Sequence, residues 1–320
     1  MVEQIKTSGL FNLDMRIFLT TVLLFTFITV IIGAIIYFTG FGSGSITVWI
    51  GLSLFMVFIQ WYLGPIIIKW STKAKDLPRE QAPGIYEIVE RLIVVAKIPM
   101  PKLYIVDSPN ANAFAFGRTQ KSAGIAIYSG LMNVLNKEEI EGVLAHEIAH
   151  IKHRDVIIMT LASVIPVMIY YGVLIFGGRD NRSGGFLVVW LGALASQFIG
   201  QLLVLWLSRS REYCADEFAA KATGKPDYLI NALAKISYTS ATKPSDSGGM
   251  IKAFYFANPS KNEANFSGEI VQLIKTGHPE KIAQAIENEK KHGGFEIIST
   301  HPLTYKRLGA LLKVKKEMGA

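Results

Sequence analysis

The chain has 320 residues, of which half are hydrophobic and only 18% are charged, and its mean hydropathy is +0.32. Such a composition is too apolar for an ordinary soluble domain of this length, so membrane-spanning segments are expected. The net charge is +8, but the basic residues gather at the ends of apolar stretches and form no separate basic domain, so we expect no nucleic-acid partner.

Two uncharged stretches predict four membrane-spanning helices. No charged residue occurs between Ile17 and Ile68, which is more than twice the roughly 20 residues that one helix needs to cross a bilayer. TGFGSGS in the middle of this stretch is typical of a turn. A second uncharged pair is divided by RDNR at 179–182. The predicted spans are about residues 16–39, 46–68, 156–178 and 184–208.

The ends of these spans predict the orientation. Lysines and arginines crowd residues 69–75, 152–154 and 209–211, whereas the turn at 40–45 has none. The positive-inside rule then places both termini and the active site in the cytoplasm of a multi-pass cell-membrane (inner or plasma membrane) protein, although the two arginines of RDNR weaken this assignment. A cleaved signal peptide is not expected, because the first apolar run is too long and follows a segment of mixed charge.

The segment between the two span pairs predicts a helix followed by a small sheet. Within 69–101, apolar residues recur at three- and four-residue steps, as in an amphipathic helix: Ile85, Ile88, Val89, Leu92 and Val95. Three short β-like runs follow, KLYIVDS (102–108), NAFAFG (112–117) and GIAIYSG (124–130).

The rest of the chain predicts helices. One runs from Lys137 into the third span, with an apolar side formed by Ile140, Val143, Leu144, Ile148 and Ile151. Another follows the fourth span, SRSREYCADEFAAKATG, and is ended by Gly224 and Pro226. Residues 227–240 and a closing segment with Pro302 in its first turn are also helical, while 241–300 has no clear period. The predicted parts are 1–68, 69–155, 156–208 and 209–320.

LAHEIAHIKHRD (144–155) predicts a metal site. On a helix His146 and His150 project from one face, so both can bind one Zn²⁺. Glu147 lies beside the ion but is displaced around the helix, where it can take a proton from the attacking water instead of acting as a ligand. A chance occurrence of this pattern on a surface helix is the alternative, because two histidines alone do not complete a catalytic site.

REYCAD (211–216) supplies the missing ligand in this interpretation. Glu212 is assigned as third ligand, and Asp216, on the same helical face, as the carboxylate that orients an imidazole. A solvated charged turn is the alternative. Cys214, the only cysteine, lies roughly 200° around the helix from Glu212 and is expected to pack elsewhere. It also excludes a disulfide within the chain and fits a reducing compartment.

The predicted topology is consistent with a shared ion. Two spans, an even number, separate His150 from Glu212, so both emerge on the same side of the membrane. If the helices continue unbroken, His150 lies about 9 Å before the third span and Glu212 about 6 Å after the fourth. Within the fourth span, small residues at four-residue steps favour close helix packing over a polar substrate path: Gly192, Ser196 and Gly200, with Gln197 and Gln201 alongside.

HEIAH, REYCAD, NAFAFG and STHPLTYKRL, arranged around four spans, resemble the HtpX-type membrane metalloproteases, relatives of the CAAX prenyl endopeptidases. The resemblance runs from the first span to about Leu312 and is weakest over 241–298. It implies a mainly α fold with a small β-sheet, an α+β zincin-like catalytic domain on a four-span helical membrane domain. It also implies a gluzincin-type endopeptidase with one Zn²⁺ per chain, held by His146, His150 and Glu212, with Glu147 as base.

The resemblance assigns two further groups of residues. NAFAFG is similar to an edge strand that holds the substrate backbone by strand addition, here Asn112, Ala113, Phe114, Ala115 and Phe116; a packing strand is the alternative. His301 and Arg307 are similar to a pair that approaches the scissile carbonyl and supports the site. A helix N-cap at Thr300 or a surface histidine is the alternative, and His278 lacks the continuation that follows His301.

The expected reaction is peptide-bond hydrolysis. Zinc lowers the pKa of water and holds the developing oxyanion, Glu147 moves the proton to the leaving amine, and His301 donates a further hydrogen bond. The expected partners are polypeptides, especially misfolded or damaged membrane proteins, and the lipid bilayer. A CAAX prenyl endopeptidase is one alternative, although its relatives carry more spans. A metal-binding transporter or channel is another, but it would need ionisable residues within the spans, and the sequence has none there.

Overall fold

The computed structural model describes residues 46–162, 165–166, 169–170, 173, 185–242, 261–292 and 301–319. The chain divides into two compact units, Met1–Phe55 with Asp246–Phe254, and Met56–Ser245 with Tyr255–Ala320. Of the first unit, the structure describes residues 46–55, the start of a helix. The predicted first span at 16–39 lies outside the described residues. Apart from these first turns of the helix, all that follows concerns the second unit, and the four-part division of the chain stays a prediction.

Long apolar helices lie where the sequence predicted the second and fourth spans. Helix α2 (Ile46–Ser71) covers the former and α8 (Gly185–Thr223) the latter. Within the described residues, only α8, from Val188 onward, satisfies a test of length and hydropathy for crossing a membrane. The third predicted span starts as α6 (Asp155–Ala162), and much of its remainder lies outside the described residues. The four-span membrane domain therefore stays a prediction.

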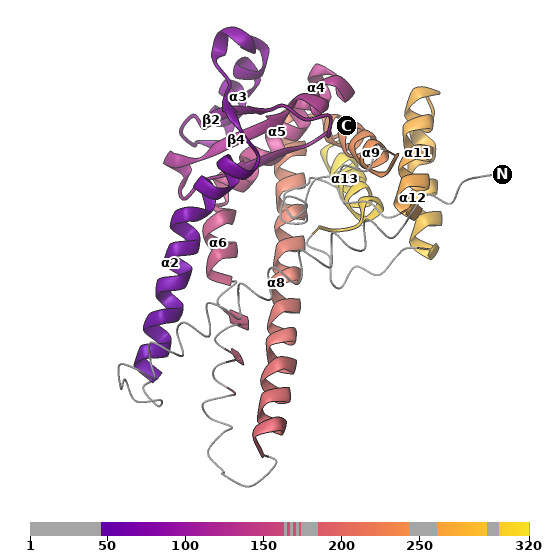
Figure 1. Ribbon diagram of the computed structural model, residues 1–320. Helices are drawn as coiled ribbons and strands as arrows, with labels where there is room; N and C mark the ends of the chain where they lie inside the picture. The colour runs from indigo at the N-terminus through magenta and orange to yellow at the C-terminus, as the bar shows by residue number, and fades with distance from the viewer. Residues whose placement is uncertain are drawn as a thin grey trace, which may run out of the picture. The chain divides into compact units, whose positions relative to one another are not determined.

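Helix α8 joins two elements that the sequence separated. We predicted a span ending near Ser208 and then a new helix, but Figure 1 shows one uninterrupted ribbon from Gly185 to Thr223. No glycine or proline lies between Gln201 and Thr223, so nothing in this stretch breaks the helix. The predicted stop is confirmed, because Gly224 has φ +66° and α9 (Pro226–Thr242) begins directly after it. Span and candidate ligand thus share one helix.

Gly200 of α8 allows another segment to approach closely. A Cβ built there would lie 2.9 Å from the Cα of Pro166, at the described part of the third predicted span. This contact supports the packing interpretation for Gly200 of the small-residue stripe.

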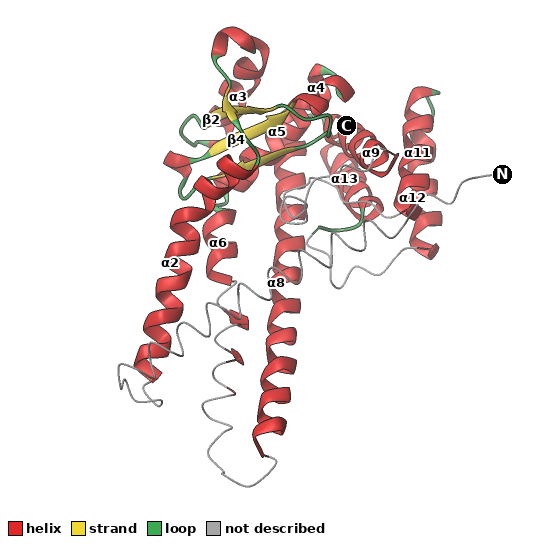
Figure 2. Cartoon of the chain, in the orientation of Figure 1, coloured by secondary structure: helices red, strands yellow, loops and turns green. Residues whose placement is uncertain are grey.

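A four-stranded mixed sheet contains the three predicted strands (Figure 2). They are β2 (Lys102–Val106), β3 (Ala113–Phe116) and β4 (Gly124–Tyr128). The order is β1-β2-β4-β3, with β2 parallel to β4 and the other pairs antiparallel. Strand β1 (Lys75–Asp76) was not predicted, because two residues are too short to show alternation. Strand β3 is therefore an edge strand of this sheet.

Helix α3 (Pro83–Ala96) contributes the predicted apolar face with one correction. Ile88 and Leu92 are buried as expected, but Val95 is 51% exposed and Ala96 takes its place in the core. The core position after Leu92 is therefore Ala96, four residues later, and not Val95, three residues later. The helix ends at Ala96, and Lys97 caps it with a left-handed backbone.

Helix α5 (Lys137–Lys152) is the centre of the core and carries the two motif histidines. It packs against β3, α3, α8 and α9. Its start is fixed by a capping box, in which the Asn136 side chain accepts a hydrogen bond from the Glu139 N–H (2.8 Å) and the Glu139 carboxylate accepts one from the Asn136 N–H (3.0 Å). Gly142 faces α9, and a Cβ there would lie 2.7 Å from the backbone nitrogen of Leu229.

We predicted that this helix continues into the third span, and that prediction is wrong. Helix α5 ends at Lys152, Arg154 has φ +58°, and α6 starts at Asp155. A single left-handed residue is enough to redirect the chain. The unbroken geometry that gave a distance from His150 to the membrane therefore does not apply.

The C-terminal part adds helices around α8 and α9. Helices α11 (Lys261–Lys275) and α12 (Ile282–His292) lie in the region without clear period. Helix α13 (Thr304–Met318) has Leu303 as its N-cap, so Pro302 precedes the helix. The prediction that Pro302 lies in the first turn is therefore wrong. The remaining short elements are η1 (Arg79–Gln81), η2 (Gln120–Ser122), α4 (Ser129–Val134) and η3 (Pro279–Lys281).

Gly142→Ala should destabilise the fold. The added methyl group meets backbone atoms of α9 that cannot move alone, and such overpacking costs about 1–3 kcal/mol. Gly84→Ala in α3 is the matched control, because a Cβ there meets nothing within 4 Å and alanine is the better helix former. Thermal unfolding in detergent measures both. Equal melting temperatures for the two variants would contradict the close α5–α9 contact.

Candidate metal centre

The structure brings the three predicted ligands together. One donor atom from each of His146, His150 and Glu212 lies within 4.8 Å of the others. The two Nε2 atoms are 3.0 Å apart, and each lies 3.6 Å from a carboxylate oxygen of Glu212. Ligand atoms bound at about 2.0–2.2 Å around a tetrahedral zinc ion lie roughly 3.3–3.6 Å apart. Two imidazoles of α5 and one carboxylate of α8 therefore fit a small divalent cation.

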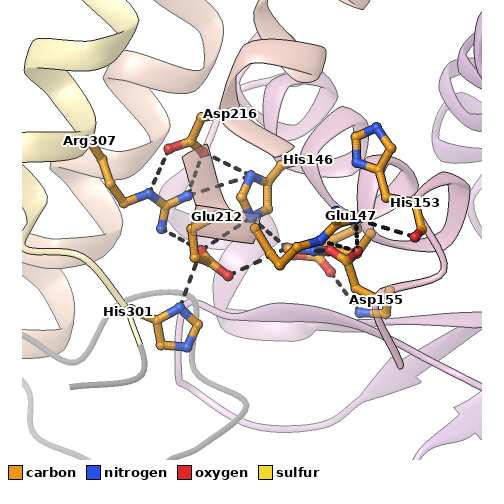
Figure 3. A network of polar contacts seen from close by, with 11 residues as sticks. His146, Glu147, His153, Asp155, Glu212, Asp216, His301 and Arg307 are labelled. Carbon is orange, nitrogen blue, oxygen red and sulfur yellow. Dashed lines mark hydrogen bonds and ion pairs between the residues drawn. The ribbon is translucent and has the colours of Figure 1, made fainter. Parts of the chain in front are cut away.

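Asp216 holds the first histidine, as the sequence predicted. Its Oδ1 lies 2.9 Å from Nδ1 of His146, which leaves Nε2 directed at Glu212 (Figure 3). Both side chains are almost fully buried. Asp216 stands one turn after Glu212 on α8, so the same helical face provides a ligand and the group that orients another.

Asp155 holds the second histidine, and sequence reasoning missed it. Its Oδ2 lies 2.6 Å from Nδ1 of His150. Its other oxygen accepts hydrogen bonds from Arg211, one of them 2.7 Å long from Nε, and Arg211 also donates to the backbone oxygen of His153 (3.2 Å). On a continuous helix a residue five positions after His150 would point elsewhere. The break at Arg154 is what turns Asp155 back, and the motif contained no signal for that break.

Arg307 and His301 both reach the carboxylate side of the site. Arg307 is 1% exposed and donates two hydrogen bonds to Asp216, one of 2.8 Å by Nε and one of 2.6 Å by Nη2. Its Nη1 lies 3.3 Å from a carboxylate oxygen of Glu212, and Nδ1 of His301 lies 3.2 Å from the same oxygen (Figure 3). His278, by contrast, is exposed and contacts Glu280. The structure therefore brings His301, and not His278, to the candidate ligands.

Glu147 lies between the histidines and the edge strand. Its Oε2 accepts a hydrogen bond of 2.7 Å from the Ala115 N–H of β3. The carboxyl group is 4% exposed, and burial raises its pKa to about 7. A group poised near neutrality next to the candidate ligands has the properties of a general base or acid.

Strand β3 directs alternate backbone groups outward. The Tyr128 N–H donates to the Asn112 oxygen (3.0 Å), so Asn112, Phe114 and Phe116 turn their polar backbone atoms toward β4. Ala113 and Ala115 then face the open edge, as the contact from Ala115 to Glu147 illustrates. At this edge the Ala115 N–H is bonded to Glu147, so the backbone groups of the predicted strand 112–116 that still point away from β4 are the Ala113 N–H and the C=O groups of Ala113 and Ala115.

The charges of the site depend on burial and on these pairings. Burial lowers the pKa of His146 to about 4 despite Asp216. For His150 burial acts in the same direction, but hydrogen bonding to Asp155 and the charge of Glu212 outweigh it and raise the pKa to about 9. Burial also opposes ionisation of Glu212, yet His301 and Arg307 hold its pKa well below its usual range. A cation must therefore displace a proton from His150 when it binds.

Cys214 takes no part in this arrangement. It is exposed on α8, so the prediction that it faces away from the ligands is confirmed, but it is not the packing residue that we expected.

Comparison with known proteins places the chain among proteases. Residues 79–315 match the model of peptidase family M48. The chain is 35% identical to a protease HtpX homolog of Thermococcus sibiricus, over 96% of this chain and 99% of that protein, and 36% identical to one of Pyrococcus furiosus, over 93% and 96%. It also resembles the crystal structure of S. mikatae Ste24p, with a TM-score of 0.54 and 20% identity over 93% of this chain and 67% of the other. This last likeness concerns the fold.

Asp155→Asn should weaken metal binding. Loss of the charge that orients His150 is expected to lower affinity about 10- to 100-fold, as for other outer carboxylates of metal sites. Asp227→Asn, whose carboxylate pairs with Lys315 at a half-exposed position, is the matched control. Competition with a chromophoric chelator gives both affinities, and melting temperatures check folding. Equal affinities in the two variants would remove Asp155 from the site.

Proposed function

This chain belongs to peptidase family M48 and is a membrane metalloprotease of the HtpX type, and we propose that it is a zinc-dependent endopeptidase built on His146, His150 and Glu212. The observation that carries this proposal is the convergence of their three donor atoms next to the Glu147 carboxylate and the edge strand β3. A metal site, a base and a means of holding an extended chain are the parts that peptide hydrolysis requires.

Zinc is proposed as the ion because of the donor set. Two neutral imidazoles and one carboxylate, each histidine with its own carboxylate partner, are typical of catalytic zinc sites that keep one position open. When bound, the ion supplies Lewis acidity and lowers the pKa of water toward neutrality.

Glu147 is proposed as the residue that moves the proton. Its carboxylate takes a proton from the attacking water and returns it to the leaving amine. The hydrogen bond from Ala115 holds this side chain beside the edge strand, where a substrate carbonyl would lie. Burial, which raises the pKa of Glu147, supports its capacity to keep the proton between the two steps.

Strand β3 is proposed to hold the substrate backbone by strand addition. The Ala113 N–H and the C=O groups of Ala113 and Ala115 point away from β4 and would pair with an extended polypeptide, whereas the Ala115 N–H holds Glu147. A mainly apolar pocket beside His150 lies at the end of this edge and would receive a substrate side chain; Phe116, Ile151 and Val156 are among its lining residues. Backbone pairing of this kind recognises an extended main chain and not particular side chains, which suits an enzyme with many substrates.

His301 and Arg307 receive different roles. His301 lies beside the candidate ligand Glu212, with Nδ1 at 3.2 Å from its carboxylate, and we assign it a hydrogen bond to the oxyanion of the transition state. Arg307 is buried against Asp216 and Glu212. We propose that Arg307 holds these two carboxylates in place. Of the pair assigned from the resemblance, only His301 is then proposed to approach the substrate.

The proposed substrates are misfolded or damaged membrane proteins, cleaved at the cytoplasmic face. Support comes from α8, in which Glu212 follows the uncharged stretch by only four residues, about 6 Å along a helix, so the site would lie close to the bilayer that this stretch is proposed to cross. The basic residues at the span ends support the orientation. The comparisons favour the HtpX type over a CAAX prenyl endopeptidase, since relatives named HtpX homologs match almost the whole chain.

Glu147→Gln should retain metal and abolish cleavage. The amide keeps the shape of the side chain but cannot take the proton. Cleavage of denatured casein by purified protein is measured with and without a chelator, together with metal content by elemental analysis. Wild-type activity that is lost with chelator and restored by zinc is expected. Full proteolysis by the variant would remove Glu147 as the base, and activity that resists chelation would refute a metal mechanism.

His301→Gln should lower kcat more than it raises KM. Loss of one donor to the oxyanion is expected to reduce kcat about 100- to 1,000-fold while metal content stays normal. His278→Gln is the matched control, since this histidine is also followed by proline but is exposed and away from the candidate ligands. If both variants cleave casein with wild-type kinetics, His301 has no role in the reaction.

A further inference from the structure

A second groove, which shares Phe116 and Arg118 with the pocket beside His150, lies at the end of α2. Its volume is about 790 Å³, which is enough for a sizeable ligand. The last turns of α2 form one wall, and side chains of β2, β3 and the loop after β3 form the other. The lining residues that matter here are Ile66, Lys69, Trp70, Lys73, Phe116 and Arg118.

The groove is strongly cationic. Lys69, Lys73 and Arg118 line it, and no aspartate or glutamate is among its lining residues in the described part of the chain. Asp76 contacts Lys69 at 3.1 Å but is itself 80% exposed at the side chain, so it neutralises at most one of the three charges. An anionic group is the ligand that this potential favours.

The position of the groove identifies the source of that anion. It extends across the end of the uncharged stretch of α2, from Pro65 to Ala74, so its cations lie at the level of lipid headgroups if α2 spans the bilayer as predicted. The helix surface that leads into it is apolar and exposed, with Ile66 51% and Ile67 46% accessible. Trp70, 82% exposed on the groove wall, is an aromatic residue of the kind that gathers at membrane interfaces.

We propose that this groove binds the headgroup of an anionic phospholipid. The phosphate would lie between Lys69, Lys73 and Arg118, and the acyl chains would follow Ile66 and Ile67 along α2. A soluble phosphate would use the cations but leave the apolar wall in water. A lipid satisfies both surfaces at once, which is why we choose it as the occupant.

The groove is connected to the edge strand of the proposed protease. Phe116 ends β3, and Arg118 follows it by two residues. Arg118 donates from Nε to the Tyr62 backbone oxygen (2.8 Å) and lies 4.3 Å from the centroid of the Tyr62 ring, while Trp61 donates to the Arg118 oxygen (3.3 Å). A headgroup bound here therefore contacts both α2 and the end of the strand whose Ala115 reaches Glu147. Lipid binding should stabilise that strand, a consequence that rests on the proposed function.

Thermal unfolding in neutral detergent tests the binding itself. Short-chain phosphatidylglycerol should raise the melting temperature of the wild type, whereas phosphatidylcholine and soluble glycerol 3-phosphate should not. Lys69→Gln with Lys73→Gln should weaken the apparent lipid affinity roughly 30-fold, since each lysine near an anionic headgroup contributes about a fivefold factor. For each protein, the shift is the difference between its melting temperature with lipid and its melting temperature in detergent without lipid.

Lys97→Gln with Lys313→Gln is the matched control. Lys97 matches Lys73, because both follow a helix and have a left-handed backbone, with φ +57° and +52°. Lys313 matches Lys69, because each pairs with an acidic side chain, and Lys313 is 80% exposed. This variant should retain wild-type lipid affinity. Equal loss in both variants, or equal shifts with phosphatidylcholine, would overturn the site, and an equal shift with glycerol 3-phosphate would overturn the choice of a lipid. Native mass spectrometry of retained phosphatidylglycerol gives a second readout.

Cleavage in vesicles tests the connection to the edge strand. Wild-type protein in phosphatidylcholine vesicles containing phosphatidylglycerol should cleave casein with a higher kcat/KM than in phosphatidylcholine alone, and the Lys69→Gln, Lys73→Gln variant should lose this difference. Equal cleavage in both vesicles would overturn the connection. A protein that binds the lipid but cleaves nothing in any vesicle would refute the proposed function and leave the binding site standing.

Discussion

The packing of α5 against α8 is the contact on which the rest of the site depends. Each helix alone carries an incomplete set of ligands, and only their contact brings a carboxylate to within 3.6 Å of two imidazoles. The contact also buries Glu212 and Asp216, whose charges would be costly to remove from water without partners. Arg307 and the histidines offset that cost, and a bound cation would complete the balance. The fold therefore stabilises the same arrangement of charges that a metal requires.

Each histidine of the site is held by a carboxylate, and each carboxylate by an arginine. Asp216 joins His146 to Arg307 of α13, and Asp155 joins His150 to Arg211 of α8. These links cross between α5, α6, α8 and α13, so no ligand can rotate without breaking a buried ion pair. Such outer contacts fix the ring orientation and direct both Nε2 atoms toward Glu212 and the proposed ion.

The membrane and the site share structural elements. Helix α8 carries both the apolar stretch and Glu212 without a break, so a displacement of that stretch reaches the carboxylate through a rigid helix. On the other side of the site, the β3 edge is tied to α2 through Arg118. The proposed lipid groove lies at this second link. Together they provide a physical reason why a protease of this kind would respond to the bilayer in which it works.

The sequence by itself determined the features that depend on local geometry. Four-residue spacing places His146 with His150, and Glu212 with Asp216, on common helical faces, and alternation or apolar periodicity predicts β2 to β4 and the faces of α3 and α5. Tertiary structure alone decided the rest. The left-handed backbone at Arg154 turns Asp155 toward His150, and the packing of α5 against α8 brings Glu212 to the two motif histidines. Arg307 lies 91 residues from Asp216 in sequence. Contacts at such separations form when buried charges find partners in a packed core, and no pattern of neighbouring residues encodes them.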